Sequence, residues 1–399
     1  MTVDESSTRT RVLVLATRIP LRSGDGTPSF VLDNAIALED EFDICVYAPR
    51  VRGATAETFH GNVRVKRFAY FPRRWERLAD DAVMPQLTRS PALWLQAFAL
   101  VLAMSIGAIR EFRRSRFDVV HAQWIMPSGL VARLLHQVFG VPYLVTAQGA
   151  DVFRLDTRPL RGLKRWIINN SARFVAVSHD IAMHIGDLTV AVEVQPSGVD
   201  FALWEGLVGR REPEAGKVLF IGRLATKKGV ADAIRAVAGI EHATLVVVGD
   251  GPLREELEHL TTELRVMNRV RFLGKRSRVE IAEQMRTASC LVIPSVTAVD
   301  GDRDGTPNVL GEAIAAALPV VGSRIAGISE FLIDGATGIL FNPGDVNELR
   351  DRIQFLFAIS NPEVIARRAR IELRGALDIN EVARRYAGWY RAAAAREEQ

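Results

Sequence analysis

The feature that most constrains the fold of this chain is a regular alternation of short apolar runs with helical patterns. Runs such as RVLVLA (11–16) and KVLFIG (217–222) are apolar at nearly every position, as in strands that helices cover on both faces. Strands and helices that alternate in this way form parallel sheets. The other runs that predict strands are 43–48, 63–68, 117–122, 142–147 and 173–178 in the first half and 244–249, 269–274, 289–294 and 319–323 in the second.

The length of the chain favours two domains. It has 399 residues, which is more than a single hydrophobic core usually serves. The short polar stretch REPEAG (211–216) lies between the two series of predicted strands and is the natural linker. We predict an α/β protein with Rossmann-like domains at 1–198 and 217–375, a linker at 199–216 and a C-terminal helix at 376–399.

The segment 300–340 carries the most informative chemistry. Asp304 and Glu312 flank a Gly-Thr-Pro turn, and the proline argues against one continuous helix over both acids. We expect Asp304 on a loop and Glu312 one turn inside a helix that begins near Asn308. Free backbone amides at such a helix start attract a phosphate. A carboxylate behind that anion site suits a ribose and one in front suits a second polyol, so the segment predicts a nucleotide-sugar site.

The same segment resembles the paired-acid signature of the retaining glycosyltransferase family four, which has the two-lobed GT-B fold. That family usually has glutamate at both positions, so Asp304 is a departure. The resemblance runs from about residue 11 to 390, and it implies two Rossmann-like domains facing across a cleft, with the C-terminal helix crossing back to the first. It implies that Glu312 binds the ribose and Asp304 the sugar of the donor. The remaining donor positions in this segment are Gly305, Thr306, Pro307, Asn308, Val309 and Leu310.

Two cations follow the first predicted strand of the second half. Arg223 and Lys228 lie on the loop that leaves this strand, at the edge where open α/β sheets bind ligands. They would neutralise a diphosphate and stabilise it as a leaving group, and they match the family's Gly-Arg-Leu…Lys-Gly motif. The neighbouring Lys227 fits the register less well. The resemblance adds four loop and strand-end positions to the donor site: Gly222, Gly249, Gly274 and Lys275.

In the first half, Gly24 and Gly26 form a flexible turn after the first strand, and such a turn can approach a phosphate closely. The loop 144–154 resembles the family's Thr-x-His-Gly-x-Asp segment, with Gln148 in place of the histidine and Asp151 retained. Glutamine can hydrogen-bond a sugar hydroxyl but cannot transfer a proton near neutral pH. We therefore expect Gln148 and Asp151 to orient the donor sugar across the cleft.

A second substitution of the same kind lies one strand earlier. Many relatives have His-x-His-Trp where this chain has His121-Ala122-Gln123-Trp124. His121 ends a predicted strand, and we expect its role to be structural rather than chemical.

The two cysteines, Cys45 and Cys290, lie in apolar runs and are expected to be buried, reduced and structural. No CxxC or HExxH motif occurs, so the sequence predicts no metal site and no cofactor. The family typically needs no divalent metal, because protein cations take that role. The polar N-terminus lacks an apolar signal region, so we expect cytoplasmic catalytic lobes.

Charge and hydropathy suggest a membrane surface as a partner. The net charge is +4, and arginine-rich groups lie at 73–77, 110–116 and 158–165 in the first half. Aromatic residues are too sparse among them for a nucleic-acid stacking platform, whereas an anionic membrane or a phosphate-bearing acceptor fits. The run 91–109 has no charged residue, and we expect either a helix buried in the first lobe or one lying in the bilayer interface.

Together these features predict a metal-independent retaining hexosyltransferase. Its donor would be a UDP-sugar or GDP-mannose, and its acceptor a glycan or lipid-linked molecule of cell-envelope or exopolysaccharide synthesis. The enzyme would lie peripherally at the inner face of the cytoplasmic membrane. Two alternatives stay open at this point: a nucleotide-sugar epimerase of the same fold, and a non-catalytic nucleotide-sugar-binding scaffold.

Overall fold

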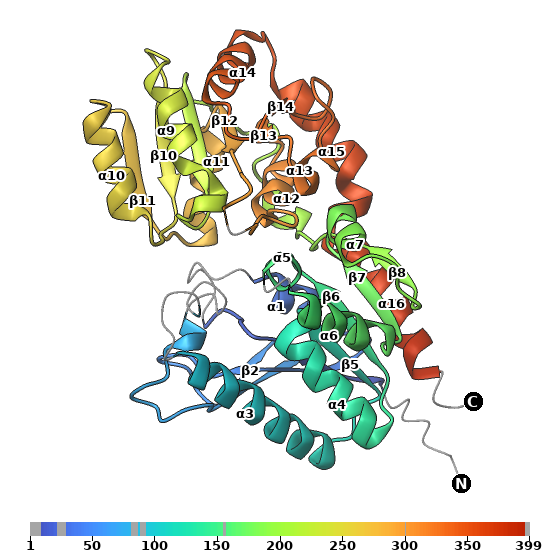
Figure 1. The fold of residues 1–399 in the computed structure, drawn as a ribbon. Helices are drawn as coiled ribbons and strands as arrows, with labels where there is room; N and C mark the ends of the chain where they lie inside the picture. Colours follow the sequence, from blue (N-terminus) through green and yellow to red (C-terminus); the bar gives the residue numbers. More distant parts are fainter. Residues whose placement is uncertain are drawn as a thin grey trace.

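The structure, a computed structural model, describes residues 9–21, 29–80, 87, 93–154, 157–299 and 301–395. It has two lobes, each built on its own sheet, with the N-lobe below the C-lobe in Figure 1. All the strands predicted from the sequence are present, and both sheets are parallel apart from one edge strand. The predicted α/β class is therefore confirmed.

The N-lobe sheet has the strand order β3-β4-β2-β1-β5-β6-β7-β8. Strand β3 pairs antiparallel with β4 at one edge, and it was missed because it is short and half-exposed, as was β8 at the other edge. The bounds are β1 Arg11–Leu15, β2 Asp43–Pro49, β3 Glu57–His60, β4 Val63–Phe68, β5 Val119–Gln123, β6 Tyr143–Ala147, β7 Arg173–Ala176 and β8 Val192–Val194.

The C-lobe sheet has the order β11-β10-β9-β12-β13-β14 and is parallel throughout. The bounds are β9 Lys217–Ile221, β10 Thr244–Val248, β11 Val270–Gly274, β12 Cys290–Ile293, β13 Val320–Ser323 and β14 Ile339–Phe341. The edge strand β14 has only three residues, and the sequence did not predict it.

Each sheet is buried on both faces. In β1, Leu13 and Leu15 join one apolar cluster of the N-lobe, whereas Val12 and Val14 join another on the opposite face. Because successive side chains of a strand point to opposite sides, two such clusters need an apolar residue at every position. This explains the continuous apolar runs in the sequence.

Helices cover both faces of the sheets, as Figure 1 shows. Those between the N-lobe strands are α1 Phe30–Ile36, α3 Leu93–Arg114, α4 Leu130–Phe139, α5 Ala150–Phe153, α6 Arg158–Asn169 and α7 His179–Ile185. The remaining helices are α8 Phe201–Glu205, α9 Val230–Ala238, α10 Arg254–Glu263, α11 Arg278–Thr287, α12 Asn308–Ala315, α13 Ala326–Ser329, α14 Val346–Ala358, α15 Glu363–Leu377 and α16 Ile379–Ala394.

Helix α16 crosses from the C-lobe to the N-lobe, as the resemblance implied. The chain turns at Asp378, whose carboxylate caps α16 by accepting a hydrogen bond from the Asn380 amide at 3.0 Å. The helix then buries Val382, Tyr386 and Tyr390 in an apolar cluster of the N-lobe. Its course along the N-lobe is visible at the lower right of Figure 1.

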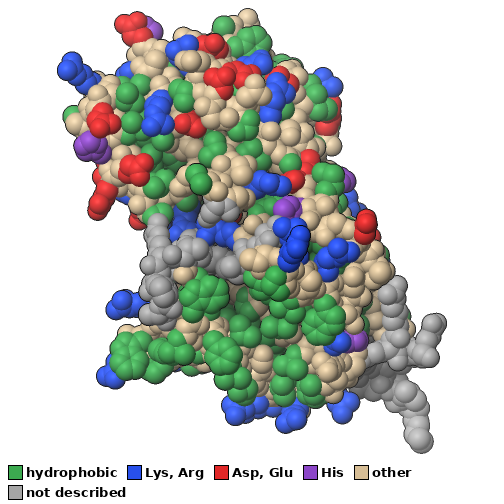
Figure 2. Space-filling view, in the orientation of Figure 1, with side chains coloured by type: hydrophobic (Ala, Val, Ile, Leu, Met, Phe, Trp, Pro, Cys, Tyr) green, Lys and Arg blue, Asp and Glu red, His purple; other side chains and the backbone are tan. Residues whose placement is uncertain are grey.

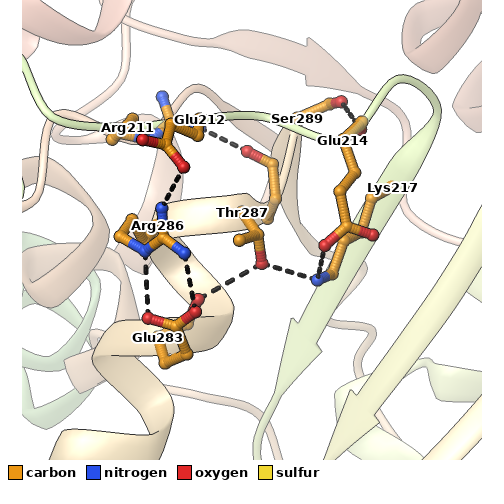
Figure 3. Close-up of polar contacts among 9 residues, drawn as sticks. Arg211, Glu212, Glu214, Lys217, Glu283, Arg286, Thr287 and Ser289 are labelled. Atoms are coloured by element: carbon orange, nitrogen blue, oxygen red, sulfur yellow. Dashed lines mark hydrogen bonds and ion pairs between the residues drawn. The ribbon is translucent and has the colours of Figure 1, made fainter.

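The polar stretch at 211–216 is fixed to the C-lobe (Figure 3). Arg286 of α11 pairs with Glu212 at 2.6 Å and with Glu283 of its own helix at 2.8 Å. Lys217 at the start of β9 pairs with Glu214 at 2.9 Å. Upstream, the short helix α8 buries Phe201 and Trp204 in the C-lobe core. The predicted linker therefore contains a helix that the sequence did not reveal, and most of its length belongs to the C-lobe.

Helix α3 contains the uncharged run noted in the sequence. It is long and apolar enough to cross a membrane by length and composition alone. One face packs into the N-lobe core through Leu100, Met104 and Ala108. The other face is exposed, with Leu95 at 64% and Phe98 at 70% of their full exposure. The structure therefore buries one face of α3 in the lobe and leaves the other face exposed. That the exposed face lies in a bilayer interface stays a prediction.

Candidate active site

The topology of both sheets brings the predicted site residues together. In the C-lobe, strand order reverses between β9 and β12, and in the N-lobe between β1 and β5. Ligands of open α/β sheets bind outside the carboxyl ends of strands at such reversals. Arg223 and Lys228 follow β9, and Asp304 follows β12, so all three lie at the C-lobe reversal. Gly24 and Gly26 follow β1, but they lie outside the described residues.

Lys228 and Asp304 form a direct ion pair. The Lys228 Nζ lies 2.8 Å from Asp304 Oδ2, and the Ser295 hydroxyl donates to the same oxygen at 2.8 Å. Asp304 is buried, which by itself raises its pKa, but Lys228, Lys227 and the Ser295 hydroxyl outweigh burial and hold the pKa below its usual value. Asp304 is therefore a carboxylate whose first partner is Lys228. Its contact with a donor sugar stays a prediction.

Lys227 takes part in the same cluster through an acid that sequence reasoning missed. Its Nζ lies 3.1 Å from Asp302 Oδ1, and Arg154 of the N-lobe lies 2.9 Å from the other oxygen of Asp302. Asp302 thus joins a cation of each lobe next to the Lys228–Asp304 pair. The two acids at 302 and 304 are visible in the sequence, but their cationic partners are distant in the chain and no local pattern identifies them.

Glycines allow the loops around Arg223 to approach one another. Gly249 has φ +129°, and a Cβ there would lie 1.9 Å from the Gly222 carbonyl oxygen. The Gly249 amide donates to the Gly274 carbonyl oxygen at 2.8 Å, which joins the loop after β10 to the end of β11. Arg223 is half-buried beside Gly222, whereas Lys275 is exposed. The structure brings these positions to one sheet edge, and their donor contacts stay a prediction.

The helix after the Gly-Thr-Pro turn begins where the sequence predicts. Helix α12 starts at Asn308 with Pro307 as its N-cap residue, and Glu312 lies one turn inside. The Leu310 amide already donates to the Pro307 carbonyl oxygen at 2.9 Å, so it is used within the turn. Asn308 and Val309 are half-buried at this helix start, where an anion would meet the helix dipole.

Glu312 has an unusual electrostatic environment. Burial raises its pKa to about 7, the positive charge of Arg278 opposes this shift, and the negative charge of Asp33 adds to it. Arg278 itself pairs with Asp33 of the N-lobe at 2.6 Å. Near neutral pH, Glu312 therefore exists in both protonation states, and only the carboxylate offers two charged acceptor oxygens to the ribose hydroxyls.

On the N-lobe side, Asp151 is used by the backbone. Its carboxylate accepts hydrogen bonds from the amides of Gln148 and Gly149 at 3.0 Å and of Ile125 at 2.8 Å. Burial raises its pKa, against the effect of these amides. The structure therefore gives Asp151 the role of shaping the Gln148 loop, and a direct contact with the sugar stays a prediction.

The Gln148 loop lies against the Gly-Thr-Pro turn of the other lobe. A Cβ at Gly305 would lie 2.9 Å from the Gln148 carbonyl oxygen, so glycine is needed for this approach. The Thr306 hydroxyl donates to the Val177 carbonyl oxygen at 2.8 Å. Nearby, two guanidinium nitrogens of Arg303, Nε and Nη2, donate to the two carboxylate oxygens of Asp180 at 2.8 Å. Figure 2 shows Lys and Arg side chains gathered at this interlobe junction.

His121 has the structural role expected from the sequence. It is buried, its Nδ1 lies 2.6 Å from the Tyr390 hydroxyl and its Nε2 2.8 Å from the Thr146 hydroxyl. Burial lowers its pKa to about 3, so it is neutral at physiological pH.

Cys45 and Cys290 are free and buried, as predicted. In the part of the chain that the structure describes, no three His, Cys, Asp or Glu side chains are grouped to hold a metal ion.

Two family profiles match this sequence. "Glycosyl transferases group 1" matches residues 215–358, and "Glycosyl transferase 4-like domain" matches residues 26–196. Glycogen synthase from Mycobacterium tuberculosis is 29% identical over 281 residues, which cover 66% of this chain and 65% of that protein. The chain belongs to the group 1 glycosyltransferases. This transferase therefore takes its sugar from a nucleotide sugar with retention of configuration, as the resemblance implied.

Solved structures establish the fold of the transferase. Sucrose-phosphate synthase from Thermosynechococcus elongatus superposes with a TM-score of 0.79 at 19% identity, over 97% of this chain and 100% of that one. Anabaena HepE in complex with UDP-glucose superposes with a TM-score of 0.71 at 18% identity, over 95% and 99% of the two chains. The two lobes thus form the predicted GT-B fold.

Proposed function

We propose that this transferase moves a hexose from a UDP-sugar to a lipid-linked acceptor at an anionic membrane surface. The observation that carries the donor half is the Lys228–Asp304–Ser295 cluster at the C-lobe strand reversal, beside the start of α12. The ammonium group of Lys228 and the positive end of the α12 dipole both lie at this sheet edge, and both would stabilise the negative charge of a diphosphate. The UDP-glucose bound by HepE, a protein of the same fold, makes a UDP-sugar the first donor to test.

The proposed reaction breaks the bond between the sugar C1 and the diphosphate oxygen, and the electron pair stays on the departing phosphate. Lys228 and Arg223 stabilise that negative charge, while Glu312 holds the ribose. The acceptor hydroxyl forms its bond to C1 on the same face, and its proton passes to the leaving phosphate oxygen. This step needs no histidine base, which is consistent with glutamine at position 148.

The donor assay measures UDP released from UDP-glucose in the presence of a membrane lipid extract. Lys228→Ala should lower the rate by roughly 10²–10³-fold, as for the loss of one electrostatic group at a leaving group. A matched control is Arg210→Ala, which removes an exposed cation from the stretch between α8 and β9, outside the donor positions. Unchanged activity in Lys228→Ala would refute the site. Interconversion of the sugar without UDP release would indicate an epimerase, and donor binding without turnover would indicate a scaffold.

The exposed face of α3 supports the membrane half of the proposal. Trp94, Leu95, Phe98, Leu102 and Ile106 are exposed at 42–70% along one side of the helix. In Figure 2, apolar side chains cover this part of the N-lobe, and Lys and Arg side chains follow its lower rim. Exposed arginines precede the helix at 73, 74 and 77, lie in its last turns at 110, 113 and 114, and follow it at 116. An apolar stripe with cationic borders is suited to an anionic bilayer interface.

Helix α3 is held in the lobe at both ends, which favours lying in the interface over spanning. Near its C-terminal end, buried Glu111 pairs with Arg64 at 3.0 Å and Lys66 at 2.6 Å. Near its start, Gln96 donates to the Trp75 carbonyl oxygen at 2.9 Å. A spanning state would break the Glu111 pairs and remove Leu100 and Met104 from the core, which costs several kcal/mol.

Liposome flotation tests the membrane half. The double variant Phe98→Asp/Leu102→Asp should float at least about tenfold less with phosphatidylglycerol vesicles, since each buried side chain is worth roughly 1.5–3 kcal/mol. The matched control is Ile371→Asp on α15 of the C-lobe, where the residue is 77% exposed. If the wild-type protein stays with the soluble fraction, the proposed membrane association is refuted. A soluble acceptor then becomes the better proposal.

A further inference from the structure

A chain of hydrogen bonds runs from the C-terminal helix to Gln148 at the interlobe junction. The Gln148 Nε2 donates to Gln123 Oε1 at 3.1 Å, and Gln123 Nε2 lies 3.4 Å from His121 Nε2. His121 Nδ1 lies 2.6 Å from the hydroxyl of Tyr390 on α16. Gln123 and His121 are both buried, whereas Gln148 is half-exposed and ends the chain. Sequence reasoning noted glutamine at 123 and 148 separately, and the structure shows that these two side chains touch.

This chain carries no charge at physiological pH. Burial lowers the pKa of His121 to about 3, so its ring is neutral, and the two amides do not titrate. A neutral ring that accepts at Nε2, from the Thr146 hydroxyl at 2.8 Å and from the Gln123 N–H at 3.4 Å, donates from Nδ1 to Tyr390. That direction leaves the Gln123 oxygen to accept from Gln148. The side-chain oxygen Oε1 of Gln148 is then the group available to a ligand.

Gln148 is fixed through its main chain as well. Its main-chain amide donates to Asp151 at 3.0 Å, and its main-chain carbonyl oxygen packs against the position of Gly305 in the other lobe. A side chain held at both ends has lost its rotamer freedom before a ligand arrives, so little entropy remains to be lost on binding. An acceptor oxygen prepared in this way is suited to one hydroxyl group of a bound sugar.

We propose that Gln123 is a positioning residue that orients Gln148, and that the two amides form an uncharged selector for one hydroxyl of the donor sugar. This inference rests on the proposed donor site and deepens it by assigning sugar selectivity to the Gln123–Gln148 pair. Loss of the Gln123 amide would leave the Gln148 side-chain oxygen without a fixed orientation, and loss of the Gln148 amide would remove that oxygen. The pair would therefore act as one unit, and its selectivity would not vary with pH near neutrality.

A double-mutant cycle tests the pair with Gln123→Leu, Gln148→Leu and the double variant, using UDP release from the donor that the wild type accepts. Each single variant should lower kcat/KM by roughly 5–10-fold, the range of one neutral hydrogen bond, mainly through KM. The double variant should fall no further than Gln148→Leu, because the first change has nothing left to orient. Gln137→Leu on the exposed side of α4 is the matched control.

Donors that each lack one hydroxyl supply the second readout. With one deoxy donor, wild type and Gln123→Leu should have the same kcat/KM. With each of the other deoxy donors, the difference in kcat/KM between the two proteins should remain. Equal losses with every donor, or losses that multiply in the double variant, would overturn the inference. If Gln123→Leu fails to fold, Gln123→Asn keeps a buried amide but is too short to reach Gln148, and the same loss is expected. A wild type without UDP release would refute the proposed function, whereas an active wild type with unchanged variants would refute only the pair.

Discussion

The most discriminating test of the site is Glu312→Gln, which should lower activity and raise stability together. Glu312 has a pKa of about 7 in the folded protein against an ordinary value of 4.5, because burial disfavours its carboxylate. The folded state therefore binds this proton more tightly than the unfolded state. The resulting stabilisation is complete below about pH 4.5 and is lost as the pH rises to about 7.

The magnitude follows from the same difference. A shift from 4.5 to about 7 corresponds to roughly 3 kcal/mol at most, and partial solvent access to Glu312 reduces it to roughly 1–3 kcal/mol. Glutamine has nearly the same shape and stays neutral at every pH. The variant should therefore be more stable than wild type by this amount above pH 7, and the difference should shrink toward pH 5.

The assay is urea unfolding at pH 5.5 and 8.5 together with UDP release at pH 8. Losing a charged acceptor for the ribose should lower kcat/KM by roughly 10–100-fold. Glu255→Gln, which removes the same charge from the exposed surface of α10, controls for net charge. Equal pH dependence of stability in wild type and Glu312→Gln would refute the burial argument. Full activity in the variant would refute the ribose assignment.

Three further predictions concern the same site. The KM for the donor should fall as the pH rises through about 7, because Glu312 then becomes the carboxylate that accepts from the ribose; a flat profile from pH 6 to 8.5 in wild type would contradict this. Asp304→Asn should lower the free energy of unfolding by roughly 1–3 kcal/mol in urea, because Lys228 keeps its charge and loses its partner; an unchanged midpoint would show that the pair contributes nothing. Asp33→Asn should remove the interlobe pair with Arg278, which small-angle scattering would detect as a larger radius of gyration. The same variant should lower the pKa of Glu312, because a negative charge near it is lost. A pH profile of KM whose midpoint is the same as in wild type would contradict this lower pKa.

The comparison of sequence and structure is clearest at the Gly-Thr-Pro turn. Local rules placed Asp304 on the loop, the helix start at Asn308 and Glu312 one turn later, and all three are confirmed. The family resemblance implied different ligands for Lys228 and Asp304, whereas the structure pairs the two side chains with each other. These residues are far apart in the chain, and only the strand order β9-β12 makes them neighbours.

Helix α3 shows the same division between local pattern and tertiary context. Its uncharged run predicted a helix, but could not distinguish a buried helix from an interfacial one. The tertiary structure decides how much of the helix the rest of the lobe covers. Leu100 and Met104 of the helix pack into the lobe core, and its Glu111 forms ion pairs with the lobe. The short edge strands β3, β8 and β14 were missed for a related reason, since an edge strand gains much of its stability from its neighbour.

The sequence by itself determined the two parallel sheets, the family, and the loops from which the site is built. Apolar periodicity, helix starts and turn residues depend on interactions between near neighbours, and these can be read along the chain. Only the tertiary structure decided which charges are paired: Lys228 with Asp304, Arg154 with Asp302, and Arg278 with Asp33. It also joined Gln123 to Gln148 and left one face of α3 exposed. These contacts depend on strand order and on the approach of the lobes, which bring together side chains that no local rule relates.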